Sequence, residues 1–216
     1  MASDKVMCLD LDGTLVNSQE AHAQSFNLAF QKNNLPMKPI ANIIEKFGPP
    51  AEGVVKAMFP KVSDRKLQQI VKDKRRLFIE RTAGLTKEIP GVKEALEQLK
   101  EDFLLVLVSN ATQEEIEVTL KAAGIKRGLF SAILGYPLMH KKPDPDIIDL
   151  VEEKAGGKVE YFVGDTIYDI QTGNMAEVKT IAVLTGVHDV KMLGAENPTI
   201  ILESFALIPD YFKGEL

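Results

Sequence analysis

Short, almost purely apolar runs alternate with helical patterns along most of this chain, and this alternation limits the possible folds more than any other feature. Runs of strand length occur at residues 6–9, 103–108, 161–163 and 180–184. Segments with apolar residues at helical spacing, such as 91–100, lie between the later runs. Strands that are apolar on both faces are typical of parallel sheets covered by helices on both sides. We therefore expect an α/β fold with a Rossmann-like parallel sheet.

Residues 16–85 have a different pattern. Four segments in this region have helical patterns, and Pro and Gly residues separate them: 21–32, 40–47, 52–59 and 64–81. We find no strand candidate here. The chain is therefore predicted to have an α/β core domain, made of residues 1–15 and 86–216, and an all-helical cap domain inserted at 16–85.

Polar clusters stand between these elements, and nearly all of them follow directly on a predicted strand. In open parallel sheets, ligands bind at the carboxyl ends of the strands. Each cluster alone has an ordinary explanation, such as a turn, a helix cap or a surface lysine. Together they bring acids, a cation and neutral donors to one sheet edge, which indicates a site for a metal ion and a phosphate. The clusters are Asp10-Leu11-Asp12-Gly13-Thr14, Ser109-Asn110, Lys142-Pro143-Asp144-Pro145 and Gly164-Asp165-Thr166-Ile167-Tyr168-Asp169.

The first cluster has two carboxylates one residue apart, Asp10 and Asp12. In an extended chain their side chains point to different sides, so we expect two different roles rather than a symmetric clamp on one ion. Gly13 permits a sharp turn with close backbone approach. A calcium loop is the alternative, but the later glutamate of such a loop is missing. Since all candidate ligands are oxygens, Mg²⁺ is favoured over Zn²⁺.

In order, spacing and strand context, the four clusters resemble the four motifs of the haloacid dehalogenase superfamily. Within it, the chain is similar to the phosphoglycolate phosphatase and β-phosphoglucomutase group, and the resemblance covers the whole chain, including the helical insert. It implies that Asp10 attacks phosphorus and forms an aspartyl-phosphate. It also implies that Asp12 protonates the leaving oxygen and later deprotonates the hydrolytic water.

The resemblance further implies the residues around the phosphate and the metal. Mg²⁺ would be held by Asp10, the main-chain carbonyl of Asp12, and Asp165. Asp169 and His22 would support this site. Lys142 is chosen over Lys141 because the family's lysine directly precedes a proline. The residues expected at the phosphoryl group are Gly13, Thr14, Ser109, Asn110 and Lys142.

The implied activity is the Mg²⁺-dependent hydrolysis of a small-molecule phosphate monoester, as in a phosphoglycolate phosphatase. A β-phosphoglucomutase-like mutase and a pyrophosphatase are the enzymatic alternatives, and a phosphate-binding regulatory protein is the non-enzymatic one. Asp12 disfavours a dehalogenase, whose leaving group needs no proton. A mutase cap binds a second phosphate with an arginine. The segment 47–52 contains no arginine, which disfavours a mutase.

Composition narrows the possible partners. The net charge of −5 disfavours a nucleic-acid binder, which needs a basic surface, and we interpret the basic stretch 72–76 as a solvated helix face. No segment approaches the roughly 18 apolar residues that span a membrane. We expect a cytoplasmic monomer or homodimer that acts on a small phosphorylated metabolite, without nucleic-acid or membrane partners. His140 and His188 lie outside all motifs and are expected on the surface.

Overall fold

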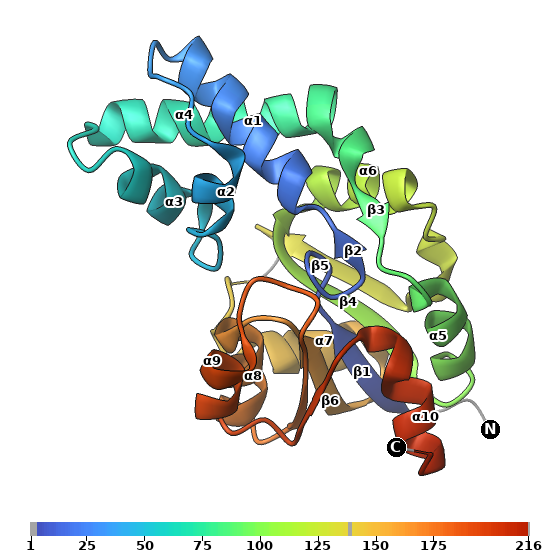
Figure 1. The fold of residues 1–216 in the computed structure, drawn as a ribbon. Helices are drawn as coiled ribbons and strands as arrows, with labels where there is room; N and C mark the ends of the chain where they lie inside the picture. Colours follow the sequence, from blue (N-terminus) through green and yellow to red (C-terminus); the bar gives the residue numbers. More distant parts are fainter. Residues whose placement is uncertain (1–3, 138–139, 216) are drawn as a thin grey trace.

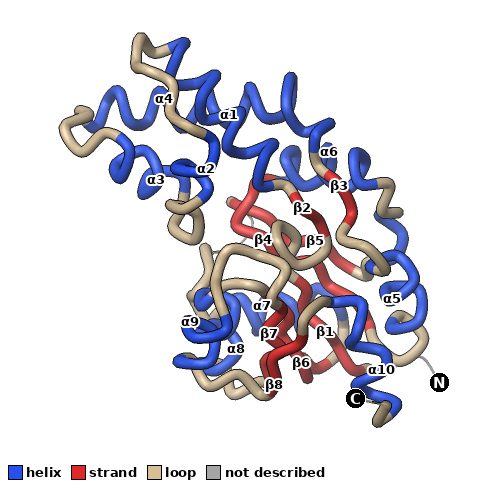
Figure 2. Tube along the Cα trace, in the orientation of Figure 1, coloured by secondary structure: helices blue, strands red, loops and turns tan. Residues whose placement is uncertain are grey.

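The computed structural model describes residues 4–137 and 140–215. Its centre is a parallel sheet of six strands in the order β5-β4-β1-β6-β7-β8. Figure 2 shows these strands as one layer with helices on both sides. The strands are β1 (Lys5–Leu9), β4 (Leu104–Thr112), β5 (Ala132–Tyr136), β6 (Lys158–Gly164), β7 (Lys179–Val183) and β8 (Ile200–Leu202).

The side chains of β1 alternate between two apolar cores, because successive residues of a strand point to opposite faces of the sheet. Met7 and Leu9 join the core beneath α5, α6 and α10. Val6 and Cys8 join the core beneath α7. All four side chains are fully buried, so the expected α/β fold with both faces covered is confirmed. The helices of this part are α5 (Val92–Leu99), α6 (Gln113–Ala123), α7 (Ile147–Ala155), α8 (Ile167–Met175), α9 (Val190–Ala195) and α10 (Ile208–Lys213).

Residues 19–77 form a second group of helices to one side of the sheet (Figure 1). They share an apolar core of their own, which includes Phe30, Ile43 and Ile70. The helices expected here are therefore present, while the division of the chain into two domains stays a prediction. Among the described residues, no helix has the length and apolar content needed to cross a membrane. The four helices are α1 (Gln19–Lys32), α2 (Ile40–Ile44), α3 (Ala51–Met58) and α4 (Asp64–Leu77), and a π-helical turn follows at Phe78–Thr82.

The expectation that residues 16–85 contain no strand is wrong. β2 (Val16–Asn17) pairs antiparallel with β3 (Lys87–Glu88). A strand of two residues has too few positions for its alternation to be visible in a sequence. The pair forms a small sheet of its own and joins the two points where the chain enters and leaves the helical segment.

Candidate active site

A pocket of about 210 Å³ lies between the carboxyl ends of the central strands and the helices α1, α3 and α4. The sheet side contributes residues that follow β1 and β6 and residues in the carboxyl-terminal part of β4, as expected for a fold of this class. All but one of the residues predicted for the site line this pocket. They are Asp10, Asp12, Gly13, His22, Ser109, Asn110, Lys142, Asp165 and Asp169.

Lys142 is the central cation of the pocket. Its ammonium group donates to Asp10, to Oδ1 of Asp169 at 2.6 Å and to the main-chain carbonyl of Val108 at 3.1 Å. Asn110 holds the lysine in place, because its Oδ1 accepts from the Lys142 main-chain N–H at 2.9 Å. Burial works against the charge on Lys142, but the carboxylates of Asp10 and Asp169 raise its pKa above the ordinary range. Lys142 is therefore a fixed positive charge beside Asp10.

Three buried carboxylates surround this lysine. Oxygens of Asp10, Asp165 and Asp169 lie within 4.8 Å of one another, and all three side chains are buried. Burial raises the pKa of Asp10 to about 7, against the attraction of Lys142 and with added repulsion from Asp169. Burial and the charges of Asp10 and Asp169 also raise the pKa of Asp165. One lysine does not balance three carboxylates, so this all-oxygen cluster suits a hard divalent cation such as Mg²⁺.

Both carboxylate oxygens of Asp169 accept hydrogen bonds from protein groups. Oδ1 accepts from Lys142, and Oδ2 accepts from the hydroxyl of Thr166 at 2.6 Å and from its main-chain N–H at 3.0 Å. The latter contacts belong to a capping box at the start of α8. Asp169 is therefore placed to support Lys142 and the cluster, rather than to offer a free oxygen to an ion.

The carboxylate of Asp12 points away from this cluster, as predicted. The hydroxyl of Ser18 donates to its Oδ1, and Nε2 of His22 lies 3.3 Å from the same oxygen. Burial pushes the pKa of Asp12 upward, but hydrogen bonds with His22 and Ser18, together with the charge of Lys74, lower it below its ordinary value. Asp10 and Asp12 thus face different partners and can do different chemistry.

A buried chain of contacts continues from His22. Nζ of Lys74 donates to Nδ1 of His22 at 2.9 Å and to Oε1 of Glu115 at 3.1 Å. The imidazole also stacks on Phe78, with ring centroids 4.2 Å apart. Because an ammonium group can only donate, Nδ1 of His22 accepts, which leaves the proton on Nε2 facing Asp12. The helical segment is thereby connected to α6 through charged groups that meet next to Asp12.

The interpretation of residues 72–76 as a solvated helix face is wrong in part. Asp73 and Lys74 are buried. Lys74 continues the stripe of Leu67, Ile70 and Val71, since positions three or four residues apart share one face of a helix. The spacing of the apolar residues indicates this burial of Lys74. Glu115 stands in a capping box with Thr112, and that motif gives no indication of its contact with Lys74.

Thr14 is the predicted site residue that does not line the pocket. Its hydroxyl is buried and donates to Oδ1 of Asp165 at 3.2 Å, so its side chain orients a predicted metal ligand. Its contact with phosphate stays a prediction. Gly13 has φ +91°, and a Cβ there would lie 2.5 Å from Oδ2 of Asp165. At Gly186, which sequence reasoning did not single out, a Cβ would lie 1.6 Å from the same oxygen. Because neither glycine has a side chain, both leave room for the carboxylate of Asp165.

The two remaining histidines differ from each other. His140 is exposed, as expected, and its Nδ1 lies 2.7 Å from a carboxylate oxygen of Asp144. His188 is buried, contrary to expectation, and its Nδ1 accepts from the main-chain N–H of Ile167 at 3.0 Å. It follows the carboxyl end of β7, so its loop folds against the start of α8. Burial lowers the pKa of His188 and favours the neutral ring that accepts this bond.

Comparisons with known proteins show the family of the chain. The family model described as haloacid dehalogenase-like hydrolase matches residues 7–183. A phosphoglycolate phosphatase from Pasteurella multocida is 32% identical and covers 96% of this chain and 98% of its own length. A pyrophosphatase from Oceanobacillus iheyensis is 29% identical, with 93% of each chain covered. The crystal structure of a predicted phosphoglycolate phosphatase from Haemophilus somnus is 25% identical, covers 98% of this chain and 99% of that one, and has a TM-score of 0.84.

Proposed function

The chain belongs to the haloacid dehalogenase-like hydrolases, and we propose that this phosphatase hydrolyses small phosphate monoesters with the help of Mg²⁺, through an aspartyl-phosphate on Asp10. The observation that carries the proposal is the arrangement around Asp10. One buried lysine contacts this carboxylate, and a second aspartate two residues later faces a histidine at the side of the pocket.

Asp10 is the proposed nucleophile. A carboxylate oxygen of Asp10 forms a bond to phosphorus while the bond from phosphorus to the leaving oxygen breaks. Asp12 supplies the proton that the leaving oxygen needs. In the second half of the reaction, Asp12 takes a proton from a water molecule that attacks phosphorus, and the carboxylate of Asp10 is released. Ser18 and His22 contact Oδ1 of Asp12 and hold this carboxyl group in place for both proton transfers.

Lys142 and Ser109 are proposed to hold the phosphoryl oxygens, because both line the same pocket as Asp10 and Lys142 contacts it. Asp10, Asp165 and the main-chain carbonyl of Asp12 are proposed to hold Mg²⁺. The ion would neutralise charge on the phosphoryl group. Asn110 and Asp169 act through Lys142, whose main-chain and ammonium groups they bind. These roles give phosphoryl transfer the positioning and charge neutralisation on which it depends.

We further propose that the helical residues 16–85 are a cap over the leaving group, with residues 1–15 and 86–216 as the core. The support is that the pocket has walls from both parts: Asp10 and Lys142 on one side, and Phe47 and Val54 on the other. A closed cap excludes water from the reacting phosphate and sets which leaving groups fit. The small phosphorylated metabolite is therefore proposed to bind with its phosphate on the sheet side.

Hydrolysis of p-nitrophenyl phosphate tests this proposal. We expect turnover with Mg²⁺ that stops on chelation and is lost in Asp10→Asn, while quenching the wild-type reaction traps a phosphorylated protein. Asp102→Asn, a change at a residue that does not line the pocket, is the matched control. Turnover that survives Asp10→Asn would overturn the mechanism. A folded chain that binds phosphate but hydrolyses no phosphate ester would favour the regulatory alternative.

A further inference from the structure

The pocket contains more positive charge than the proposed reaction uses. Its basic lining residues are Lys74, Arg75, Lys141 and Lys142. Lys142 is balanced by Asp10 and Asp169, and Lys74 is balanced by Glu115. Arg75 and Lys141 remain, and they come from different elements: Arg75 from α4 and Lys141 from the loop before α7.

Arg75 has no carboxylate partner in the part of the chain that the structure describes. Its guanidinium group instead lies over the ring of Tyr136, 5.7 Å from the centroid, and the side chain is half-buried. Its neighbour Arg76, by contrast, contacts Asp73 at 3.6 Å. Arg75 lines this pocket and also a neighbouring one that includes Tyr136, and its hydrogen-bond donors are not committed to an acid.

Lys141 lies on the same aromatic ring, 5.0 Å from its centroid. The carboxylate of Glu52 is 3.9 Å away, which is too long for a hydrogen bond. The same Glu52 oxygen is buried without any hydrogen-bond partner among the described residues. The positive charge of Lys141 is thus only weakly balanced by the carboxylate of Glu52. Two like charges near one ring repel each other, and a bound anion would relieve that repulsion.

We propose that Arg75 and Lys141 form a second anion site, which binds a carboxylate or phosphate carried by the leaving group. This inference rests on the proposed function and names its substrate class: small phosphate compounds with a second anionic group. The planar guanidinium of Arg75 suits the paired oxygens of such a group. The pocket volume of about 210 Å³ lies below the range of roughly 300–1,000 Å³ typical of larger ligands, so the leaving group is a short one.

Two substrates of matched size test the proposal. Phosphoglycolate and ethyl phosphate both have a two-carbon leaving group, but only the first carries a carboxylate, and pyrophosphate tests a phosphate in its place. We expect wild type to have a higher kcat/KM for phosphoglycolate or for pyrophosphate than for ethyl phosphate. Which of the two is preferred identifies the second anion. Arg75→Gln should lower this preference about 10- to 100-fold, mainly through KM, as for the loss of a hydrogen bond to a charged group.

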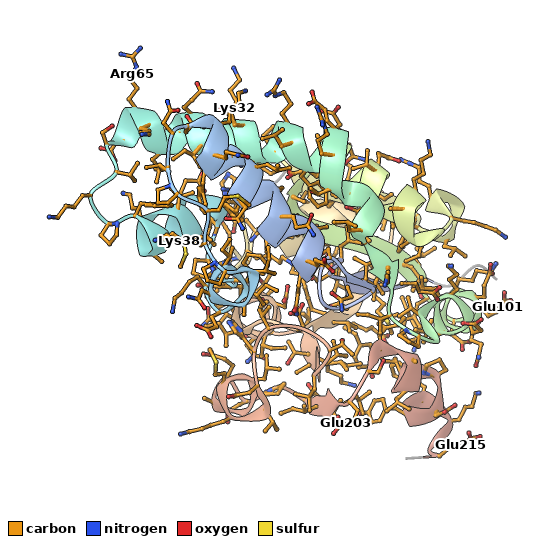
Figure 3. All side chains as sticks on the ribbon, turned by 45° about the horizontal axis from the view of Figure 1, so that its top comes forward. Lys32, Lys38, Arg65, Glu101, Glu203 and Glu215 are labelled. Atoms are coloured by element: carbon orange, nitrogen blue, oxygen red, sulfur yellow. The ribbon has the colours of Figure 1, made fainter. Side chains whose placement is uncertain are left out.

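Three further variants make the result decisive. Lys141→Gln should lower the preference in the same direction, and Arg75→Lys should restore part of it. Arg65→Gln, at an exposed position of the same helix that points away from the molecule (Figure 3), should keep the wild-type preference. Equal kcat/KM values for all three substrates, or a preference that survives both Arg75→Gln and Lys141→Gln, would overturn the anion site alone. Absence of Asp10-dependent hydrolysis of every phosphate would overturn the proposed function as well.

Discussion

The ammonium of Lys74 lies 3.1 Å from the carboxylate of Glu115, and both side chains are almost completely buried. Lys74 belongs to α4 of the helical segment, whereas Glu115 belongs to α6 beside the sheet. Burial would raise the pKa of Glu115, but the charge of Lys74 and the hydrogen bond from the Thr112 main chain lower it to about 2. The pair therefore stays ionised inside the protein and ties the two parts of the chain together next to Asp12.

Removing Glu115 should be strongly destabilising, because it leaves the Lys74 ammonium buried without its counter-charge. We expect Glu115→Ala to lower the free energy of unfolding by about 3–5 kcal/mol, the usual effect of breaking a buried ion pair. Urea denaturation measures this change. Glu117→Ala removes a carboxylate from the same helix, where its partner Arg127 is exposed, and should lose less than about 1 kcal/mol. Equal losses in the two variants would contradict the importance of the buried pair.

The sequence predicted the sheet, the helical segment and most of the pocket, because these depend on local patterns. Asp10 and Asp165 each follow an apolar run, and the carboxyl ends of parallel strands meet at one edge. Lys142 was separated from Lys141 only by its position before proline, and the structure does bring Lys142 to Asp10.

The features that the sequence did not reveal depend on contacts between distant segments. Glu115 and Lys74 are 41 residues apart, and nothing local indicates that they meet. Thr14 was assigned to the phosphate, although its hydroxyl binds Asp165, 151 residues away. The burial of His188 has no signal in the sequence, because its partner is a main-chain N–H and no side-chain motif indicates such a contact.

The lowered pKa of Asp73 predicts that the protein loses stability in acid. It accepts hydrogen bonds from Lys32, Asn33 and Gln69. Burial pushes its pKa up, but these partners lower it from the ordinary 3.8 to about 2. A lowered folded-state pKa stabilises the protein above pH 3.8 and ceases to do so as pH falls through 2.

We therefore expect Asp73→Asn to lower the free energy of unfolding by about 2 kcal/mol at pH 7, since one pKa unit corresponds to about 1.4 kcal/mol. The difference from wild type should shrink as the pH falls from 4 to 2, which thermal unfolding at several pH values would measure. Asp64→Asn, at a highly exposed position at the start of the same helix, is the control. A pH-independent difference would contradict the role of Asp73 ionisation.

Lys142 should matter for the chemical step rather than only for binding. Lys142→Met removes the positive charge beside Asp10, so we expect kcat for p-nitrophenyl phosphate to fall about 10²- to 10³-fold, as for the loss of one charge-stabilising donor. Single-turnover kinetics measure the chemical step directly. Lys154→Met, an exposed lysine on α7, should keep the wild-type rate. A change confined to KM would show that Lys142 binds the phosphate without acting on the transition state.

Gly186 should control the binding of Mg²⁺, because a Cβ at this position would lie 1.6 Å from Oδ2 of Asp165. We expect Gly186→Ala to displace that carboxylate and to weaken Mg²⁺ binding about 10- to 100-fold, the usual effect of disturbing the partners of a ligand. Isothermal titration calorimetry with Mg²⁺ measures the affinity without requiring turnover. Gly128→Ala is the matched control, since nothing lies within 4 Å of its added Cβ. Unchanged Mg²⁺ affinity in a folded Gly186→Ala protein would remove Asp165 from the set of metal ligands.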